Sequence, residues 1–88
     1  MIWRVEFDER ARRELRKLDP ASQRALLRYL RERIAGGEDP RRFGKALSCE
    51  LSGLWRYRVG DYRMVCRIED ELLIVLVLRV AHRREVYE

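Results

Sequence analysis

Residues 54–68 read LWRYRVGDYRMVCRI, and this stretch predicts a β-hairpin around which the rest of the chain can be arranged. Apolar and polar side chains alternate over 54–59 and again over 62–68, which is the period of half-buried strands. Gly60-Asp61 lies between the two segments and fits a two-residue type II′ turn, which needs Gly at its first position. We therefore expect two antiparallel strands paired around this turn.

The predicted hairpin has one apolar and one basic face. The apolar face carries Trp55, Tyr57, Val59, Tyr62, Met64, Cys66 and Ile68. The basic face carries Arg56, Arg58, Arg63 and Arg67. In this register Arg58 lies directly opposite Arg63, where like charges destabilise a sheet. A bound phosphate would explain the arrangement, because guanidinium groups bind phosphate with two parallel hydrogen bonds. The structural alternative is a solvated basic face in an arginine-rich chain.

Strands are also predicted near both ends of the chain. Over residues 2–7, alternation places Trp3, Val5 and Phe7 on one face. Residues 72–80, LLIVLVLRV, are apolar almost throughout, which is typical of a central strand covered on both faces or nearly so.

Two helices are predicted between the first strand and the hairpin. Apolar residues recur at helical spacing over 9–18, directly after Asp8, a preferred N-cap residue. Asp19-Pro20 is a second start signal, and the helix that follows is expected over 20–35, before Gly36-Gly37. The two helices should form an antiparallel hairpin.

The resulting order, β-α-α-β-β-β, predicts an α+β fold. We expect a small single domain over residues 1–88, with the helical hairpin packed on one face of a mainly antiparallel sheet. Residues 38–53 are expected to be a loop with one short turn, because Pro40, Gly44 and Gly53 interrupt them.

The composition is that of a folded, basic protein. The 88 residues are 47% hydrophobic and 40% charged, with a formal net charge of +5. Except for Lys17 and Lys45, all of the 20 basic residues are arginines. Such a surface favours a polyanionic partner, meaning nucleic acid, an anionic membrane or an acidic protein.

Several function classes are not expected. There is no signal-peptide pattern, and the longest apolar run, Leu72 to Leu78, is far shorter than the ~20 residues that span a bilayer. A single His, with Cys49 and Cys66 in no CxxC motif, predicts no metal site, and no glycine-rich phosphate loop predicts a nucleotide cofactor. Free thiols suit a reducing cytosol. We expect a cytoplasmic protein without metal, cofactor or membrane anchor.

The C-terminal segment His82-Arg83-Arg84-Glu85-Val86-Tyr87 is a second candidate functional element. It follows a buried strand and can fold back over the basic face. His82 is the one side chain whose ordinary pKa, about 6.5, lies near neutrality. Tyr87 offers a flat ring for stacking on a base. The structural alternatives are a surface histidine and a tyrosine packed at the edge of the core.

Three segments together resemble the RelE/ParE toxin superfamily of bacterial and archaeal toxin–antitoxin systems. They are FDERARRELRKLDP near the start, LWRYRVGDYRMVCRI in the hairpin and VLRVAHRREVYE at the end. The resemblance covers essentially the whole chain and implies the βααβββ fold of the RelE branch. It also implies an activity: RelE-type toxins enter the ribosomal A site and cut mRNA without a metal. The 2′-hydroxyl attacks the adjacent phosphorus, leaving a 2′,3′-cyclic phosphate and a 5′-hydroxyl.

The resemblance also implies roles for individual residues. The catalytic set becomes Arg56, Arg58, Arg63, Arg83 and Tyr87, and Arg67 and Arg84 join the first three of these as RNA-binding residues. Arg63, with its two neighbours across the hairpin, would hold the scissile phosphate, because fixed cations stabilise charge that develops on phosphoryl oxygens. Arg83 would lie near the leaving 5′-oxygen, and Tyr87 would stack on the nucleotide.

One departure from the family bears on the mechanism. Well-known RelE-type toxins have lysines where this chain has Arg56 and Arg58, and arginine is a poor general base. Two readings follow. Either the base is weak or absent and electrostatic stabilisation dominates, or His82 serves as the acid or base.

The expected partners are the ribosome, its mRNA and a cognate antitoxin. An acidic antitoxin, partly disordered when free, would suit a toxin with a charge of +5. Operator DNA would be bound only through the toxin–antitoxin complex. Two other functions stay open: a ParE-like toxin that inhibits DNA gyrase by binding, without nuclease activity, and an inactive relative that binds only an antitoxin and operator DNA.

Overall fold

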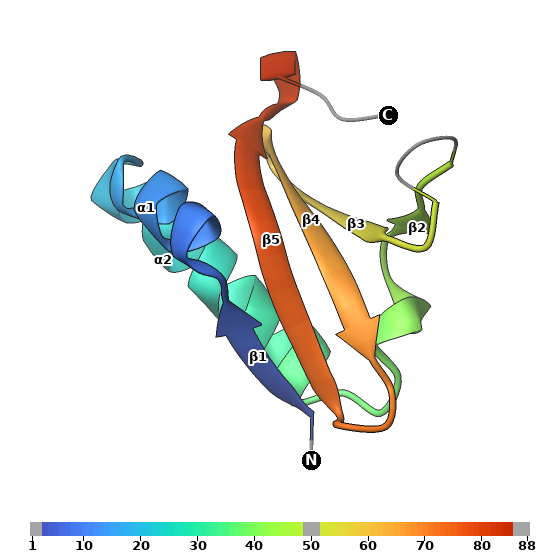
Figure 1. Ribbon diagram of the computed structural model, residues 1–88. Helices are drawn as coiled ribbons and strands as arrows, with labels where there is room; N and C mark the ends of the chain where they lie inside the picture. The colour runs from blue at the N-terminus through green and yellow to red at the C-terminus, as the bar shows by residue number, and fades with distance from the viewer. Residues whose placement is uncertain (1–2, 49–51, 86–88) are drawn as a thin grey trace.

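The computed structural model describes residues 3–48 and 52–85, which form two layers (Figure 1). Five strands make one sheet in the order β1-β5-β4-β3-β2, and the helices cover one of its faces. The strands are β1 (Arg4–Phe7), β2 (Lys45–Ala46), β3 (Trp55–Val59), β4 (Tyr62–Glu69) and β5 (Ile74–His82). The predicted α+β arrangement, with a helical hairpin on one face of the sheet, is confirmed.

Strand pairing is mainly antiparallel, as expected. β4 pairs antiparallel with β3 on one side and with β5 on the other. β1 joins the far side of β5 in parallel, from Arg4 opposite Ile74 to Phe7 opposite Val77. The helical hairpin supplies the connection between the first strand and the rest of the sheet, and β5 becomes a central strand.

Both helices begin at the predicted caps. The Asp8 carboxylate accepts a hydrogen bond from Ala11 N at 2.9 Å and starts α1 (Glu9–Arg16). The Asp19 carboxylate accepts one from Ser22 N at 3.1 Å and starts α2 (Pro20–Tyr29). These side chains satisfy backbone N–H groups that have no partner within the helix.

The predicted helix over 20–35 continues beyond α2 as a π-helical segment, η1 (Leu30–Ala35). Its buried residues are Leu30 and Ile34, which continue the apolar stripe of α2. The segment ends at Ala35, the last predicted helical position, and Gly36 is its C-cap.

The expected loop over 38–53 contains the predicted short turn and also a short strand that the sequence pattern did not predict. A 3₁₀ turn, η2 (Pro40–Arg42), precedes β2, and β2 pairs with Arg56 and Trp55 of β3. Two residues are too few to produce a visible alternation. Glycine permits this pairing, because a Cβ on Gly44 would lie 2.3 Å from the Arg56 carbonyl oxygen.

The last strand also differs from its predicted bounds of 72–80. Leu72 is 65% exposed and belongs to the β4–β5 turn, whereas the strand continues to His82. Its outer face carries no second layer within the described residues, and Leu76 is half-buried there, yet no residue of the strand is fully exposed. A bulge between Val65 and Cys66 shifts the pairing with β5.

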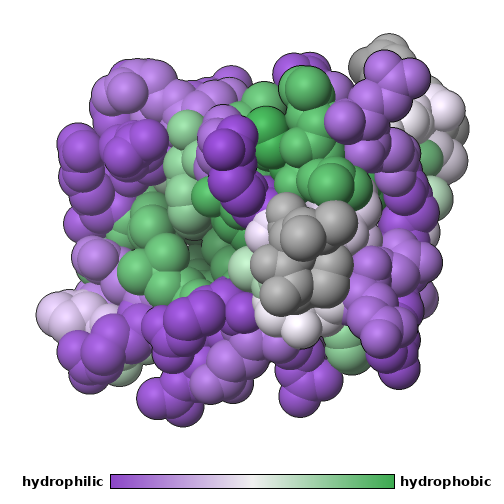
Figure 2. All heavy atoms as spheres, turned by 90° about the horizontal axis from the view of Figure 1, so that it is seen from below, coloured by the Kyte–Doolittle hydropathy of each residue, from purple (hydrophilic) through white to green (hydrophobic). Residues whose placement is uncertain are grey.

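The core lies between the helices and the inner face of the sheet. Its buried members are Trp3, Ala11, Leu26, Leu30, Ile34, Tyr57, Met64, Cys66, Val75, Val77 and Val80. Tyr57 is fully buried and donates its hydroxyl to the Pro40 carbonyl oxygen at 2.6 Å. Apolar side chains also reach the surface at the end of the molecule shown in Figure 2, within a hydrophilic rim. None of the helices in the described part of the chain is long and apolar enough to cross a membrane.

Candidate functional site

The hairpin of β3 and β4 has the register predicted from its sequence. Val59 pairs with Tyr62 across the turn, and Arg58 lies directly opposite Arg63. Gly60 has φ of 57°, the left-handed conformation that the first position of a type II′ turn requires. The turn therefore sets the register that places the two guanidinium groups side by side on the outer face of the sheet.

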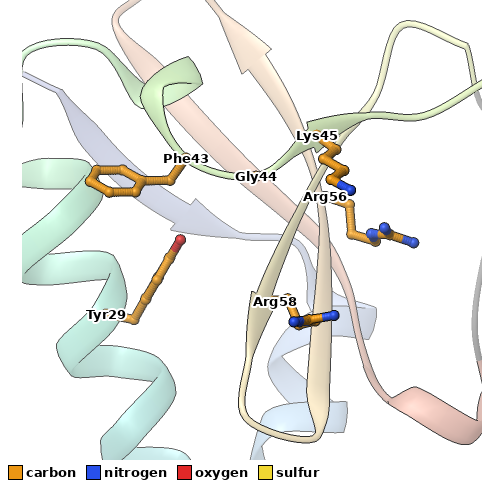
Figure 3. Close-up of a pocket in the computed structure, with 6 residues that line it drawn as sticks. All are labelled: Tyr29, Phe43, Gly44, Lys45, Arg56 and Arg58. Atoms are coloured by element: carbon orange, nitrogen blue, oxygen red, sulfur yellow. The ribbon is translucent and has the colours of Figure 1, made fainter.

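Four arginines influence one another on this face. The pKa of Arg63 is lowered, first by partial burial and then by the charges of Arg58, Arg56 and Arg83. Arg56 and Arg58 extend from the same side of β3 (Figure 3). We call these four residues the arginine cluster. Their mutual repulsion opposes folding, and an anion placed among them would relieve it.

Arg83 reaches the cluster because the chain after β5 is tied to the hairpin turn. Its backbone N–H donates to the Asp61 carbonyl oxygen at 2.6 Å. Its side-chain Nε lies 3.6 Å from Asp61 Oδ1, and both side chains are about 60% exposed. An ion pair this open to water contributes little, so a phosphate can replace the carboxylate at small cost. The sequence pattern of Gly60-Asp61 predicts only a turn and does not reveal this contact.

The floor beneath the arginines is apolar. Val65, opposite Arg56, is 3% exposed, and Ala81, opposite Arg63, is 4% exposed. Buried apolar side chains lower the local dielectric, which strengthens the attraction between guanidinium and phosphate. The position of Val65 on the basic face is readable from the alternation in β4, whereas Ala81 lies beyond the strand bounds predicted from the apolar run.

Two predicted RNA-binding residues lie apart from the cluster contacts. Arg67 Nε donates to Glu69 Oε2 at 2.7 Å, which engages its guanidinium on the strand itself. Arg84 is exposed in a 3₁₀ turn, η4 (Arg83–Glu85), that follows β5. The predicted stacking residue Tyr87 lies outside the described residues.

His82 does not share the face of the arginine cluster. It pairs with Tyr62, and strand alternation places both on the side of Met64 and Val80, beneath the helices. The two rings are in edge-to-face contact, 5.4 Å between centroids. His82 Nδ1 accepts a hydrogen bond from Arg84 N at 3.2 Å, so the imidazole helps to form η4.

Other groups with catalytic chemistry are scarce in the described part of the chain. No three His, Cys, Asp or Glu side chains there are grouped to hold a metal ion. Cys66 is fully buried, and burial raises the pKa of its thiol above the ordinary value. The site is therefore a set of fixed cations on an open sheet face, suited to binding a phosphodiester and stabilising negative charge.

Comparison with known proteins identifies chains of the same kind. A family model described as the ParE toxin of the type II toxin–antitoxin system, parDE, matches residues 5–87. The toxin RelG of Mycobacterium tuberculosis is 39% identical over 87 residues, covering 99% of this chain and 98% of RelG.

Solved structures agree with this sequence similarity. The crystal structure of the toxin–antitoxin complex RelBE2 from M. tuberculosis superposes with a TM-score of 0.80 and 40% identity, covering 92% of this chain and 91% of that one. The isolated E. coli RelE toxin gives a TM-score of 0.71 and 26% identity, with 91% and 83% covered.

Proposed function

The chain belongs to the RelE/ParE family of toxins of type II toxin–antitoxin systems, and on that premise we propose that it is an endoribonuclease that cuts mRNA in the ribosomal A site. The observation that carries this proposal is the arginine cluster. Arg58 and Arg63 lie directly opposite each other, an arrangement that weakens the sheet and that a bound phosphodiester would justify.

The proposed reaction is a transesterification within the RNA strand. The 2′-oxygen forms a bond to the adjacent phosphorus while the bond from phosphorus to the 5′-oxygen breaks. The 2′-hydroxyl gives up a proton and the leaving 5′-oxygen gains one, so that the products are a 2′,3′-cyclic phosphate and a 5′-hydroxyl. Arg63, supported by Arg56 and Arg58, would stabilise the charge on the phosphoryl oxygens, and Arg83 would face the leaving oxygen.

Charge stabilisation, rather than a strong general base, is the proposed source of rate enhancement. Arginine stays protonated at working pH and does not abstract the 2′-hydroxyl proton. His82 contacts Tyr62 on the helix side of the sheet, away from the cluster face, which favours proton loss to water over transfer to the imidazole. Tyr87 keeps its proposed role as a base-stacking residue, and Arg84 and Arg67 their proposed contacts to the RNA backbone.

The decisive experiment maps cleavage on ribosomes programmed with a defined mRNA. Wild-type protein should produce cuts within the A-site codon that carry 2′,3′-cyclic phosphate ends. Arg63→Ala and Arg83→Ala should each abolish cleavage and growth arrest while leaving antitoxin binding largely intact. Full toxicity in both variants would rule out the assignment.

A second candidate function is inhibition of DNA gyrase, because the matching family model is named for ParE. Expression without antitoxin separates the two functions. Cuts inside codons support the nuclease, whereas an SOS response with intact transcripts supports gyrase poisoning. Normal growth on induction would indicate an inactive relative.

The proposed regulator is an acidic antitoxin in the same cytoplasm. The related RelBE2 toxin was solved as a toxin–antitoxin complex, and a net charge of +5 favours an acidic partner here. Co-purification of this chain with the product of an adjacent reading frame would test the partnership, and operator binding should then require the complex.

A further inference from the structure

A pocket of about 270 Å³ opens beside the arginine cluster, at the edge of the sheet where β2 and β3 meet the end of α2. Tyr29 and Phe43 line it on the helix side of β3, Gly44 lies between the two groups, and Lys45, Arg56 and Arg58 line its rim with their charged ends directed away from the two rings (Figure 3). We call it the edge pocket. Its volume is near the lower end of the range for small-molecule sites, roughly 300 Å³, and suits one flat ring.

The aromatic wall of the edge pocket is built from two half-buried rings. Tyr29 and Phe43 meet edge to face, 6.4 Å between centroids at an interplanar angle of 71°. The Arg33 guanidinium lies 5.2 Å from the Phe43 centroid and 6.0 Å from that of Tyr29. This contact raises the number of cations around the pocket and keeps them on an aromatic surface.

The wall is held in place before any ligand arrives. Trp55 Nε1 donates to the Phe43 carbonyl oxygen at 2.6 Å, and the Tyr29 ring packs against buried Tyr57 at 5.9 Å. Gly44 has φ of 80° and lies against β3 where a side chain would collide with the Arg56 carbonyl. A pre-formed wall lowers the conformational entropy lost on binding.

The cationic wall is shared with the arginine cluster. Arg58 of β3 lines the edge pocket and also lies opposite Arg63 of β4. The pocket and the proposed phosphate site therefore adjoin each other at Arg58. Lys45 is exposed and forms no ion pair with a carboxylate among residues 3–48 and 52–85. An aromatic platform bordered by cations is how proteins hold single-stranded nucleic acid, because rings stack on bases while cations neutralise phosphates.

We propose that the edge pocket is a nucleotide subsite, in which a base that flanks the cut stacks against Tyr29 and Phe43 while Lys45 contacts the adjoining phosphate. The proposal rests on the proposed RNA function, since it takes the ligand of the edge pocket to be the same RNA molecule that the arginine cluster binds. It adds a second point of attachment, which would fix the direction of the RNA across the arginine cluster.

The test uses short single-stranded RNAs that carry one 2-aminopurine and a 2′-deoxy sugar at the cut position, so that they bind without being cleaved. Wild-type protein should quench 2-aminopurine at one flanking position, because stacking quenches this base. Phe43→Leu should bind about tenfold more weakly and lose the quenching, as expected for the loss of one stacking partner. Phe43→Tyr retains the ring and should behave as wild type.

Lys45→Ala provides a variant that does not disturb the core. It should weaken binding of the same RNA and reduce its salt dependence, whereas Arg24→Ala, on the exposed surface of α2, should do neither. The melting temperature of each variant shows whether it is still folded, so that weaker RNA binding can be distinguished from unfolding.

The outcomes distinguish the subsite from the proposed nuclease. Unchanged quenching in folded Phe43→Leu, with normal cleavage by wild-type protein, would overturn the subsite alone. Quenching that depends on Phe43, in a protein that cuts no mRNA, would support the subsite and refute the nuclease. Equal affinity of wild type and Lys45→Ala at every salt concentration would also count against the subsite.

Discussion

At the scale of single residues, the basic face of the hairpin places function and stability in opposition. Arg58 and Arg63 are partners in the strand register, and the charge of Arg58 helps to lower the pKa of Arg63. Like charges in directly opposed positions cost roughly 0.2–1 kcal/mol relative to neutral pairs. The wild-type residue at position 58 should therefore be less favourable for folding than a neutral β-former.

We predict that Arg58→Thr stabilises the protein and weakens its activity. The melting temperature should rise by a few degrees, since about 1 kcal/mol corresponds to ~4–8 °C in a domain of this size. The gain should vanish at high salt, which screens the repulsion. Calorimetry at low and high salt measures the effect, and Arg67→Thr is the control because Arg67 is paired with Glu69. A variant that is both less stable and fully active would contradict this account.

Residue patterns predicted the positions of the cluster arginines in the hairpin better than they predicted the positions of His82 and Arg83. Alternation about Gly60-Asp61 was enough to place Arg58 opposite Arg63. The position of Arg83 depends on a contact with the Asp61 carbonyl that links residues distant along the chain, and periodicity carries no information about such contacts. The side of the sheet on which His82 lies depends on where β5 ends, and the apolar run placed that end two residues too early.

At the scale of elements, glycine decides how closely the segment before β2 approaches β3. Gly44 combines φ of 80° with a close approach to the backbone of β3, whereas Gly53 has φ of 93° and open space where a Cβ would lie. From the sequence, both positions are predicted simply as glycines in a loop. The difference between them comes from the strand β2. Its two residues are too few to show the alternation of apolar and polar side chains that predicts a strand.

This difference predicts unequal costs for the same substitution. Gly44→Ala should lose about 3 kcal/mol, from the left-handed backbone and from the clash with a carbonyl that cannot move freely. Gly53→Ala should lose only about 1 kcal/mol, for the backbone alone. Urea unfolding of the two variants gives the comparison, and equal losses would show that β2 does not pack closely on β3.

The carboxylate of Glu14 adds polar contacts between the helical layer and the sheet. Glu14 of α1 accepts from the Val80 backbone N–H at 2.7 Å and pairs with Arg79 at 2.8 Å, at the part of β5 that extends beyond β1. Strand edges left open are sites of unwanted pairing, and this side chain covers one.

We predict that Glu14→Ala destabilises the protein by about 2 kcal/mol, because it leaves a partly buried N–H without its acceptor. Glu14→Gln should cost less, since its amide oxygen can still accept from Val80. Glu9→Ala removes an exposed i,i+4 pair with Arg13 and should cost only about 0.3–0.5 kcal/mol. Denaturant unfolding of the three variants measures the loss in the free energy of unfolding for each. If Glu14→Ala lost no more than Glu9→Ala, Glu14 would not stabilise the contact between α1 and β5.

At the scale of the whole molecule, the arginines of the sheet face and those of the helices differ in how they are paired with acidic residues. The chain carries +5 overall, and the sheet face opposite the helices holds the arginine cluster. On α1, by contrast, Arg10 and Arg13 lie in i,i+4 pairs with Glu14 and Glu9. Long-range attraction should guide an RNA strand to the molecule, while the arginine cluster should supply most of the close contacts to it.

Salt dependence distinguishes these contributions quantitatively. For single-stranded RNA, the logarithm of the binding constant should fall by about 0.7 for each neutralised phosphate per decade of salt. The four arginines of the cluster would contribute about −3 to the slope, and Arg63→Ala should remove about 0.7 of it. Arg24→Ala removes a charge from the exposed surface of α2 and should leave the slope unchanged. Fluorescence anisotropy across a salt titration measures all three slopes. If Arg24→Ala lowered the slope as much as Arg63→Ala, binding would depend on net charge rather than on the position of the cluster, and the site would have to be reassigned.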